Sequence, residues 1–302
     1  MTLTSSLRAV VVAAVVALGT VVPGANAANA SPAGSSSTGS SIIASSPSGG
    51  SYLSLGDSLA AGYQPARGGR AAGDDPTGGY VGVVAAGLTR RGERLRVTNL
   101  ACTGETTATM LTGGRCAYPQ GSQLAAARAH LRAHRDTRLV TVTVGANDVR
   151  SCLAGGGIDY RCAWRELAMV GRNLDAILTA VRREAPQARI VVLDYYNPYL
   201  AARLTGSRGH RLAVGATMIQ TRLNAVIRRE AADHGARTAR IAAAFDSTDL
   251  RQIDAPGIER VPRNVARICA WTWMCSAQDI HANDTGYDIM GKAVLARLAE
   301  PR

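Results

Sequence analysis

The sequence predicts an α/β fold in which helices cover both faces of a parallel sheet. Segments typical of strands alternate with segments typical of helices from about residue 52 onwards, which is the pattern of parallel sheets. The run LVTVTV at 139–144 is nearly all apolar and rich in β-branched residues, as expected of a strand buried on both faces. The segment 51–302 contains no repeat or second linker, and its length suits one domain of this kind.

The first part of the chain supplies three strands and a helix. A strand is expected at 52–55, and a Gly-rich loop follows it before a helix begins at 79–88. A second strand is expected at 96–100, ahead of the buried strand at 139–144.

The second part continues the alternation. Helical periodicity extends over 163–184 and is ended by Pro186, after which RIVVLDY, from Arg189, is expected to form another buried strand. A long helix at about 213–234 ends before Gly235, a residue common at helix ends because it tolerates left-handed backbone conformations.

A fifth strand at 238–243 and a last helix at 285–298 complete the expected order of elements. In parallel sheets of this kind, ligands bind beyond the carboxyl ends of the strands. Ser58 follows the first strand, Gly104 follows the second and Asn147 follows the third. We therefore expect these three residues to meet at one rim of the sheet.

His281, just before the last helix, completes a set of residues with a clear chemical meaning. Acyl transfer requires a nucleophile, a base and groups that donate hydrogen bonds to an oxyanion. Ser58 and His281 fit the first two roles, and Gly104 and Asn147 fit the third. The chain has no GxSxG motif, which argues against the α/β-hydrolase lipases.

Four sequence blocks resemble those of the SGNH or GDSL hydrolases, in particular the secreted esterases of actinobacteria. The first block is LGDSLAAGY with Ser58, and the second is NLACTGETT with Gly104. The third is VGANDV with Asn147, and the last is DIHANDTGY with His281. The blocks occur in the family's order, and the resemblance covers essentially all of 51–302.

The resemblance implies a three-layer α/β/α sandwich with a parallel, flavodoxin-like sheet of five strands. It also implies a serine esterase or lipase that hydrolyses carboxylic acyl esters, including lipid or phospholipid esters, through a Ser58 acyl-enzyme with His281 as base. The oxyanion would be bound by the N–H groups of Ser58 and Gly104 and by the Asn147 amide. Neither a cofactor nor a metal is expected. The alternatives are a carbohydrate O-deacetylase of the same family and a non-catalytic envelope-binding protein.

The acid that orients the histidine is the point at which this chain departs from the family. The family places that acid three residues before the histidine, where this sequence has Gln278. The nearby carboxylate is Asp279, two residues before His281, and it reaches the imidazole only if the chain turns there. Asp279 is therefore the candidate acid, and the alternative is a Ser58–His281 dyad oriented by a main-chain carbonyl.

Six cysteines are expected to form disulfides. Six cysteines allow 15 connectivities, and neighbour pairing is the preferred one, as in the secreted branch that the chain resembles. Zinc binding is the competing interpretation, but no CxxC pair occurs. His130 and His134 have helical metal-site spacing, yet Leu131 stands where zinc proteases have Glu, so a solvated helix face is expected. The expected pairs are Cys102 with Cys116, Cys152 with Cys162, and Cys269 with Cys275.

The N-terminal part has the features of an exported protein. One positive charge, an apolar run and small residues resembling a cleavage site predict a secretory signal at 1–30 and an extracellular protein. An uncleaved anchor is the alternative, although a spanning helix needs about 20 apolar residues. The segment 31–50 is rich in Ser, Gly and Pro and is expected to be a disordered linker before the hydrolase domain at 51–302.

The charge and the aromatic residues bear on partners. The formal net charge is +12, almost all from Arg, but these residues are spread over helices, so no nucleic-acid partner is expected. We expect a monomer whose basic surface also allows peripheral contact with an anionic envelope or lipid. Several aromatic or apolar side chains are expected either to line an acyl pocket or to pack loops: Tyr195, Tyr196, Tyr199, Trp271, Trp273 and Met274.

Overall fold

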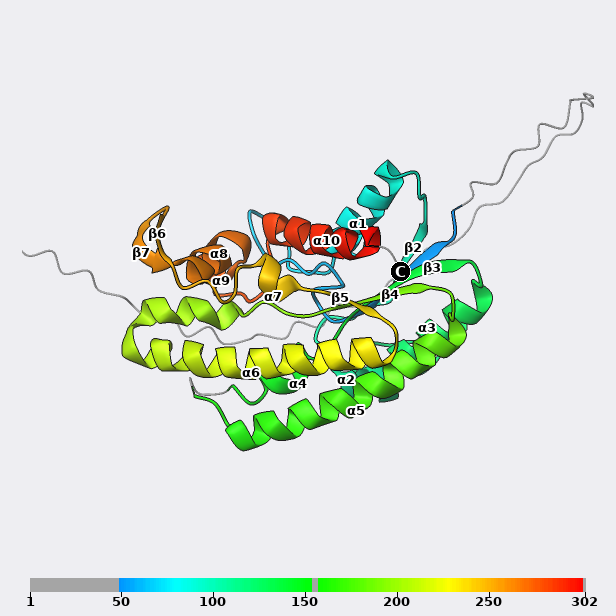
Figure 1. The fold of residues 1–302 in the computed structure, drawn as a ribbon, viewed down its shortest axis with the longest axis horizontal. Helices are drawn as coiled ribbons and strands as arrows, with labels where there is room; N and C mark the ends of the chain where they lie inside the picture. Colours follow the sequence, from blue (N-terminus) through cyan, green and yellow to red (C-terminus); the bar gives the residue numbers. More distant parts are fainter. Residues whose placement is uncertain (1–48, 154–156, 301–302) are drawn as a thin grey trace, which may run out of the picture. The chain divides into compact units, whose positions relative to one another are not determined.

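Five parallel strands form the central sheet of the computed structural model, which describes residues 49–153 and 157–300 (Figure 1). The predicted signal at 1–30 lies outside the described residues, as does the predicted linker except for its last two residues. The spatial order is β2-β1-β3-β4-β5, and each neighbouring pair is parallel. The strands are β1 (Ser51–Gly56), β2 (Arg96–Asn99), β3 (Thr137–Thr143), β4 (Arg189–Leu193) and β5 (Arg237–Ala239).

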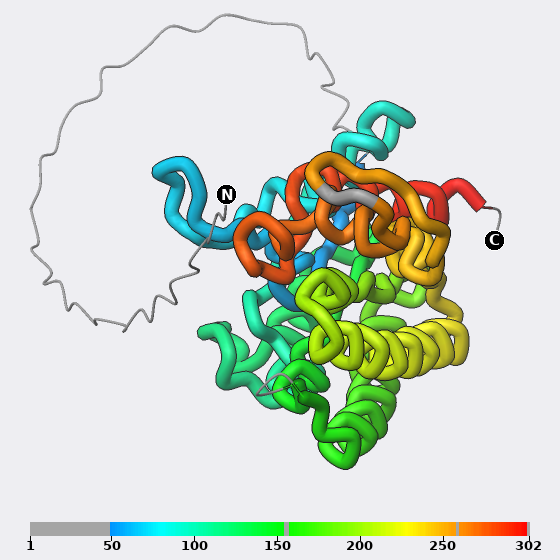
Figure 2. Tube along the Cα trace, turned by 90° about the vertical axis from the view of Figure 1, so that its left-hand side faces the viewer, coloured from blue at the N-terminus to red at the C-terminus, as the bar shows by residue number. Residues whose placement is uncertain are grey.

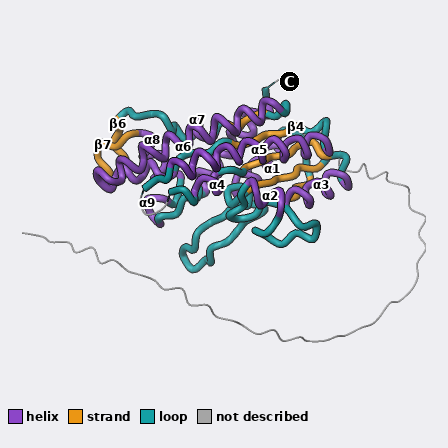
Figure 3. The backbone as a smooth tube through the Cα atoms, turned by 90° about the horizontal axis from the view of Figure 1, so that it is seen from below, coloured by secondary structure: helices purple, strands orange, loops and turns teal. Residues whose placement is uncertain are grey.

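Helices cover both faces of this sheet and confirm the predicted three-layer α/β/α sandwich. One layer contains α1 (Gly79–Arg90), α7 (Ile241–Ala244), α8 (Arg263–Trp271), α9 (Met274–Ala277) and α10 (Asp284–Ala299) (Figure 1). The other contains α2 (Thr107–Thr112), α3 (Gln123–Ala133), α4 (Ala146–Arg150), α5 (Tyr160–Glu184), the 3-10 helix η1 (Pro198–Thr205) and α6 (Gly206–Asp233). Figure 3 shows this second layer in front of the strands.

The strands are buried because both faces of the sheet are covered. Leu53, Leu55, Val140 and Val142 have no exposed surface, which explains the continuous apolar runs in the sequence. α5 contributes an apolar stripe with helical spacing that includes Leu174 and packs on the same core. None of the described helices is long and apolar enough to cross a bilayer.

The structure differs from the expected elements in the last third of the chain. The fifth strand ends at Ala239, and the second half of the segment expected as a strand, 238–243, is the start of α7. Alanine favours helix, and Asp194 accepts a hydrogen bond from the N–H of Ala242 in the first turn of α7. The long helix expected at 213–234 starts at Gly206.

An antiparallel hairpin is among the elements that the sequence analysis did not predict, as are the shorter helices α2, α3, α4, η1, α8 and α9. It consists of β6 (Gln252–Ala255) and β7 (Ile258–Pro262), which lie outside the central sheet. Its strands have only 4 and 5 residues, so the polar–apolar alternation of β6 is too short to stand out in the sequence.

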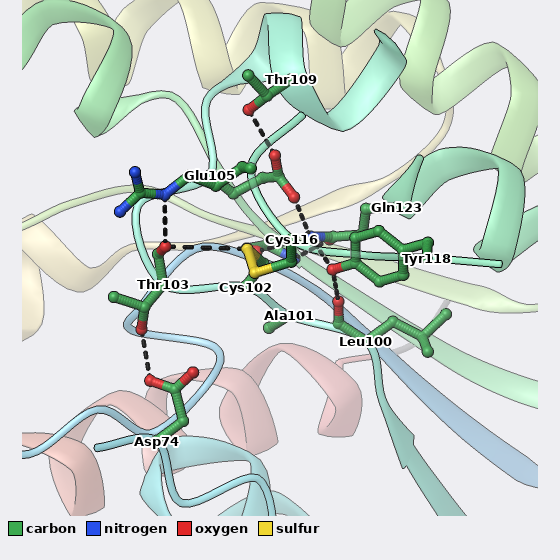
Figure 4. Close-up of a disulfide and its surroundings, with 12 residues drawn as sticks. Asp74, Leu100, Ala101, Cys102, Thr103, Glu105, Thr109, Cys116, Tyr118 and Gln123 are labelled. Atoms are coloured by element: carbon green, nitrogen blue, oxygen red, sulfur yellow. Dashed lines mark hydrogen bonds between the residues drawn. A yellow bond between two sulfur atoms is a disulfide. The ribbon is translucent and has the colours of Figure 1, made fainter. Parts of the chain in front are cut away.

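The six cysteines form three disulfides between sequence neighbours. Each pair closes a short loop, because the two cysteines are separated by 14, 10 or 6 positions in the sequence. The first loop follows β2 and carries the second family block (Figure 4). The bonded pairs are Cys102–Cys116, Cys152–Cys162 and Cys269–Cys275.

Candidate active site

Ser58 lies in the tight turn that ends β1. The N–H of Asp57 donates to the carbonyl of Thr143, and the Asp57 carboxylate accepts a hydrogen bond from the N–H of Leu59. Gly56 has a φ of 141°, and a Cβ at this position would meet the Thr143 oxygen at 2.2 Å. The glycine therefore lets β1 and β3 approach closely where the turn begins, and the turn leaves the Ser58 side chain facing a pocket.

His281 and Asp279 complete a hydrogen-bonded chain with Ser58. The His281 Nε2 atom lies 2.8 Å from Ser58 Oγ, and its Nδ1 atom lies 2.7 Å from Asp279 Oδ1. The same Asp279 oxygen accepts the backbone N–H of His281 at 2.9 Å. With Nδ1 protonated and donating to Asp279, Nε2 is free to accept the Ser58 proton, which is the arrangement of an activated nucleophile.

A left-handed turn brings Asp279 to the imidazole. Gln278 has a φ of 54°, and the Trp273 backbone anchors both sides of the turn: its N–H donates to the carbonyl of His281, and its carbonyl accepts the N–H of Asp279. Burial alone would raise the pKa of Asp279, but the hydrogen bonds from His281 and the charges of His281 and Arg150 outweigh it and lower that pKa. Asp279 is therefore held as a carboxylate beside the ring.

Asn147 and Gly104 lie on neighbouring loops that are tied together. Asn147 lines the same pocket as Ser58 and His281, and its Nδ2 donates to the carbonyl of Glu105 at 3.0 Å. One amide hydrogen is thereby fixed, which orients the second. Gly104 itself is not among the residues that line the pocket, but it directly precedes Glu105.

Gly104 is required by its surroundings. Its φ is 83°, and a Cβ would meet the Arg115 guanidinium at 2.4 to 2.6 Å. Arg115 is held there because its Nε donates to the carbonyl of Thr103 at 2.9 Å. A side chain at residue 104 would therefore both strain the backbone and displace Arg115.

A buried polar network supports these loops and was not found by the sequence analysis (Figure 4). Gln123, on α3, donates to the Glu105 carboxylate at 2.8 Å. The same amide accepts the N–H of Gly56 at 2.6 Å and donates to its carbonyl at 3.0 Å. Gln123 therefore connects the strand end before Ser58 to the loop of Gly104. Burial raises the pKa of Glu105, and the hydrogen bonds from Thr109 and Gln123 oppose that effect.

Asp57 is a second buried carboxylate beside the nucleophile. The Tyr195 hydroxyl donates to its Oδ2 at 2.6 Å. Burial raises the pKa of Asp57 from 3.8 to about 6, although the hydrogen bonds from Tyr195 and Leu59 and the charge of His281 oppose the rise. Because this carboxylate accepts hydrogen bonds from the Leu59 N–H and the Tyr195 hydroxyl, its contacts indicate a structural role.

The family model for GDSL-like lipases and acylhydrolases matches residues 54–289. The chain belongs to the GDSL-like lipase/acylhydrolase family. It is therefore a serine hydrolase. The family match spans all four blocks that carried the resemblance.

Solved structures share the fold of this GDSL hydrolase at low sequence identity. A putative GDSL-like lipase from Parabacteroides merdae is 14% identical, with 82% of this chain and 94% of that chain covered and a TM-score of 0.53. An extracellular lipase from Streptomyces rimosus is 22% identical, with 83% of this chain and 100% of that chain covered and a TM-score of 0.51. No curated protein matches the chain.

An apolar pocket adjoins the nucleophile of the GDSL hydrolase. Its empty volume is about 640 Å³, counting the space open to solvent. Most of its wall is apolar. Three ionisable side chains other than the tyrosines also line it: Asp57, Arg150 and His281. The apolar part of the wall includes Leu59, Val149, Leu153, Pro198, Ala216, Ile219 and Ile280.

Three of the six aromatic or apolar side chains that were candidates for an acyl pocket line the pocket. Tyr195, Tyr196 and Tyr199 line it, and the Tyr196 hydroxyl donates to the carbonyl of Ile280, next to His281. Trp271, Trp273 and Met274 are not among its lining residues.

The two tryptophans instead pack loops around the pocket. The Trp273 indole donates to the Gln64 side chain at 2.6 Å. Trp271 packs edge-on against Phe245 and carries the Arg267 guanidinium over its ring. The alternative that these side chains stabilise loops is the one that the contacts favour.

In the described part of the chain, one group of side chains could share a metal ion: Asp175, Glu230 and His234. His234 already contacts Asp175 at 3.3 Å and the carbonyl of Glu230 at 2.8 Å, and the Glu230 carboxylate contacts Arg229. These pairings account for the group without an ion. The rings of His130 and His134 contact each other at a tilt at the end of α3, and both residues are partly buried rather than fully solvated as expected.

Proposed function

We propose that this GDSL hydrolase is a secreted esterase or lipase that hydrolyses carboxylic acyl esters through a Ser58 acyl-enzyme. The observation that supports it most strongly is the chain of hydrogen bonds from Asp279 through His281 to Ser58, beside an apolar pocket. An activated serine explains the hydrolytic chemistry, and the pocket explains how an apolar acyl group is held.

In the proposed reaction, His281 Nε2 takes the Ser58 proton while Ser58 Oγ attacks the ester carbonyl. The negative charge of the tetrahedral intermediate is received by the N–H groups of Ser58 and Gly104 and by the Asn147 amide. Collapse of the intermediate breaks the ester bond, and His281 returns its proton to the departing alcohol. Water, deprotonated by His281, then releases the carboxylic acid and restores Ser58. Asp279 stabilises the protonated His281 in both steps.

The apolar lining of the pocket favours esters of longer acyl chains over acetyl esters, and the hydrogen-bonded Ser58, His281 and Asp279 favour an enzyme over a binding protein. An acetyl group would leave most of the apolar wall without contacts, whereas a longer acyl chain would bury it. A binding protein would have no need of a serine hydrogen-bonded to a histidine–aspartate pair. Secretion is supported by the predicted signal at 1–30 and by three disulfides, which persist outside a reducing cytosol.

A fluorescent alkyl fluorophosphonate, from which an activated serine displaces fluoride, tests the proposed nucleophile. We expect the mature chain to be labelled, with the added mass on the peptide that contains Ser58, and Ser58→Ala to remain unlabelled. Labelling of the wild-type chain no greater than that of Ser58→Ala would contradict an activated Ser58 and would favour the envelope-binding alternative.

A further inference from the structure

Exposed apolar side chains gather on the layer that contains α5 and α6. Seven large apolar residues are exposed in the described part of the chain, and five of them lie on α5, η1 or α6. Their exposed fractions are between 42% and 50%, well above those of core residues. The five are Tyr160, Trp164, Leu204, Val214 and Met218.

Four of these side chains lie on two helices that pack together, and we call the surface they make the α5–α6 face: Tyr160, Trp164, Val214 and Met218. Tyr160 and Trp164 are four residues apart on α5, so they share one side of that helix. Val214 and Met218 have the same spacing on α6. The two helices pack together, and a Cβ on Gly215 would meet the Tyr160 hydroxyl at 2.6 Å. Figures 1 and 2 show α6 running alongside α5 in the same layer.

The charged side chains of η1 and of α6 up to Arg229 are all arginines, apart from any charge on His210. No acidic residue occurs between Asp194 and Glu230, whereas this segment contains six arginines. Arg211 and Arg222 are exposed and continue the spacing of Val214 and Met218, so they lie on the same stripe of α6. An apolar surface bordered by arginines is complementary to a surface with an apolar interior and anionic groups.

The acyl pocket lies on the other side of the same helix. Ala216 and Ile219 of α6 line the pocket, and so does Tyr199 of η1. α6 therefore presents one side to the pocket next to Ser58 and another to solvent. A lipid surface in contact with the exposed side would hold the enzyme at the surface that carries its esters, with α6 lying between that surface and the pocket.

We propose that the α5–α6 face docks this enzyme on an anionic lipid surface. The proposal rests on the proposed esterase function in that such a surface supplies the substrate, but docking itself requires no catalysis. Trp164 and Tyr160 enter the interfacial region, where rings with one polar edge are stabilised. Val214 and Met218 insert beside them, and Arg211 and Arg222 contact anionic headgroups.

The test measures binding of the inert Ser58→Ala chain to vesicles by sedimentation. Neutral vesicles contain phosphatidylcholine alone, and anionic vesicles contain phosphatidylcholine with about 30% phosphatidylglycerol. We expect binding to the anionic vesicles, with a blue shift of tryptophan fluorescence that Trp164→Phe removes in large part. Raising the salt concentration should weaken binding, because the Debye length shortens from about 10 Å at 0.1 M to about 3 Å at 1 M.

Two variants and a control separate the contributions within the Ser58→Ala background. Trp164→Ala with Met218→Gln, and separately Arg211→Glu with Arg222→Glu, should each reduce the partition coefficient by about 10-fold or more. Leu250→Gln is the matched control, because Leu250 is 57% exposed but lies outside the face. It should bind like the parent chain.

The same substitutions in the active chain distinguish this proposal from the esterase function. Hydrolysis of soluble p-nitrophenyl acetate should change by less than about twofold, because none of these side chains lines the pocket. Unchanged vesicle binding in both double variants would overturn the docking proposal while leaving the esterase function intact. A concentration-dependent dimer that is disrupted by Trp164→Ala would also overturn it, in favour of a second copy of the chain.

Discussion

Replacing Asp279 by asparagine removes one negative charge from the proposed active site with little change in shape. Oδ1 of Asp279 accepts both the Nδ1–H and the backbone N–H of His281. The amide oxygen of asparagine is able to accept the same two hydrogen bonds. The Asp279→Asn variant therefore tests the charge more than the geometry.

The magnitude follows from the contact distance. The interacting atoms are 2.7 Å apart, and delocalisation over the ring and the carboxylate places the centres of charge roughly 4 Å apart. At an effective dielectric constant near 20, that attraction is about 4 kcal/mol. The Asp279 side chain is 24% exposed, so water screens part of it. A loss of about 3 to 4 kcal/mol corresponds to a kcat lower by about 100- to 1000-fold.

The assay is kcat for a saturating p-nitrophenyl ester at pH 8, with thermal unfolding as a test of integrity. Asp288→Asn is the matched control, because Asp288 is an exposed carboxylate on α10 paired with Lys292. It should change kcat by less than about twofold. A loss below 10-fold in Asp279→Asn would refute the reasoning and would favour a Ser58–His281 dyad oriented by the main chain.

Three other changes probe neighbouring parts of the site. Asn147→Ala should lower kcat by about 100- to 1000-fold with little effect on KM, because an oxyanion donor acts mainly in the transition state; an equal rise in KM would contradict that role. Gly104→Ala should also lower kcat, and adding Arg115→Ala should restore only part of it, since the steric clash is relieved but the positive φ remains; full recovery would show that the backbone is not strained. Burial raises the folded-state pKa of Asp57 from 3.8 to about 6, so its ionisation reduces stability as the pH rises through this range and keeps it reduced above pH 6. Tyr195→Phe removes a hydrogen bond to that carboxylate and should lower the free energy of unfolding in urea by about 2 kcal/mol at pH 8. At pH 4.5, where Asp57 is protonated, the loss should be roughly half of that. An equal loss at both pH values would contradict this account.

The sheet could be predicted from the sequence because its signals are local, and the same signals place three candidate site residues at its rim. Ser58, Gly104 and Asn147 each follow a strand, and parallel strands bring their carboxyl ends to one rim. The buried strands also have an unmistakable composition, as Val140 and its neighbours show.

Other features depend on contacts between distant segments, which periodicity does not reveal. The approach of Asp279 to His281 requires the left-handed turn at Gln278, a residue type without a strong preference for that conformation. Gln123 is 67 positions from Gly56, so its hydrogen bonds to that strand end have no local signature. The short strand β5 gives way to α7 after Arg240, and such short segments do not distinguish strand from helix by pattern.

The acyl pocket shows the same limit. Its tyrosines follow β4 directly and line the pocket, whereas the tryptophans of the Cys269–Cys275 loop contact other partners. Proximity to His281 in the sequence does not determine which way a side chain points. The α6 residues Ala216 and Ile219 reach the pocket through packing of the second helical layer, and no motif marks them.

The central claim is that Ser58 forms an acyl-enzyme with an apolar acyl group held in the adjoining pocket. The most direct test is kcat/KM of residues 31–302 for p-nitrophenyl esters from acetate to palmitate, with Ser58→Ala as the control. We predict an optimum at a chain longer than acetate and its loss in Ser58→Ala. A preference for acetate alone would contradict the acyl pocket and favour a deacetylase, and equal activity in Ser58→Ala would contradict the nucleophile.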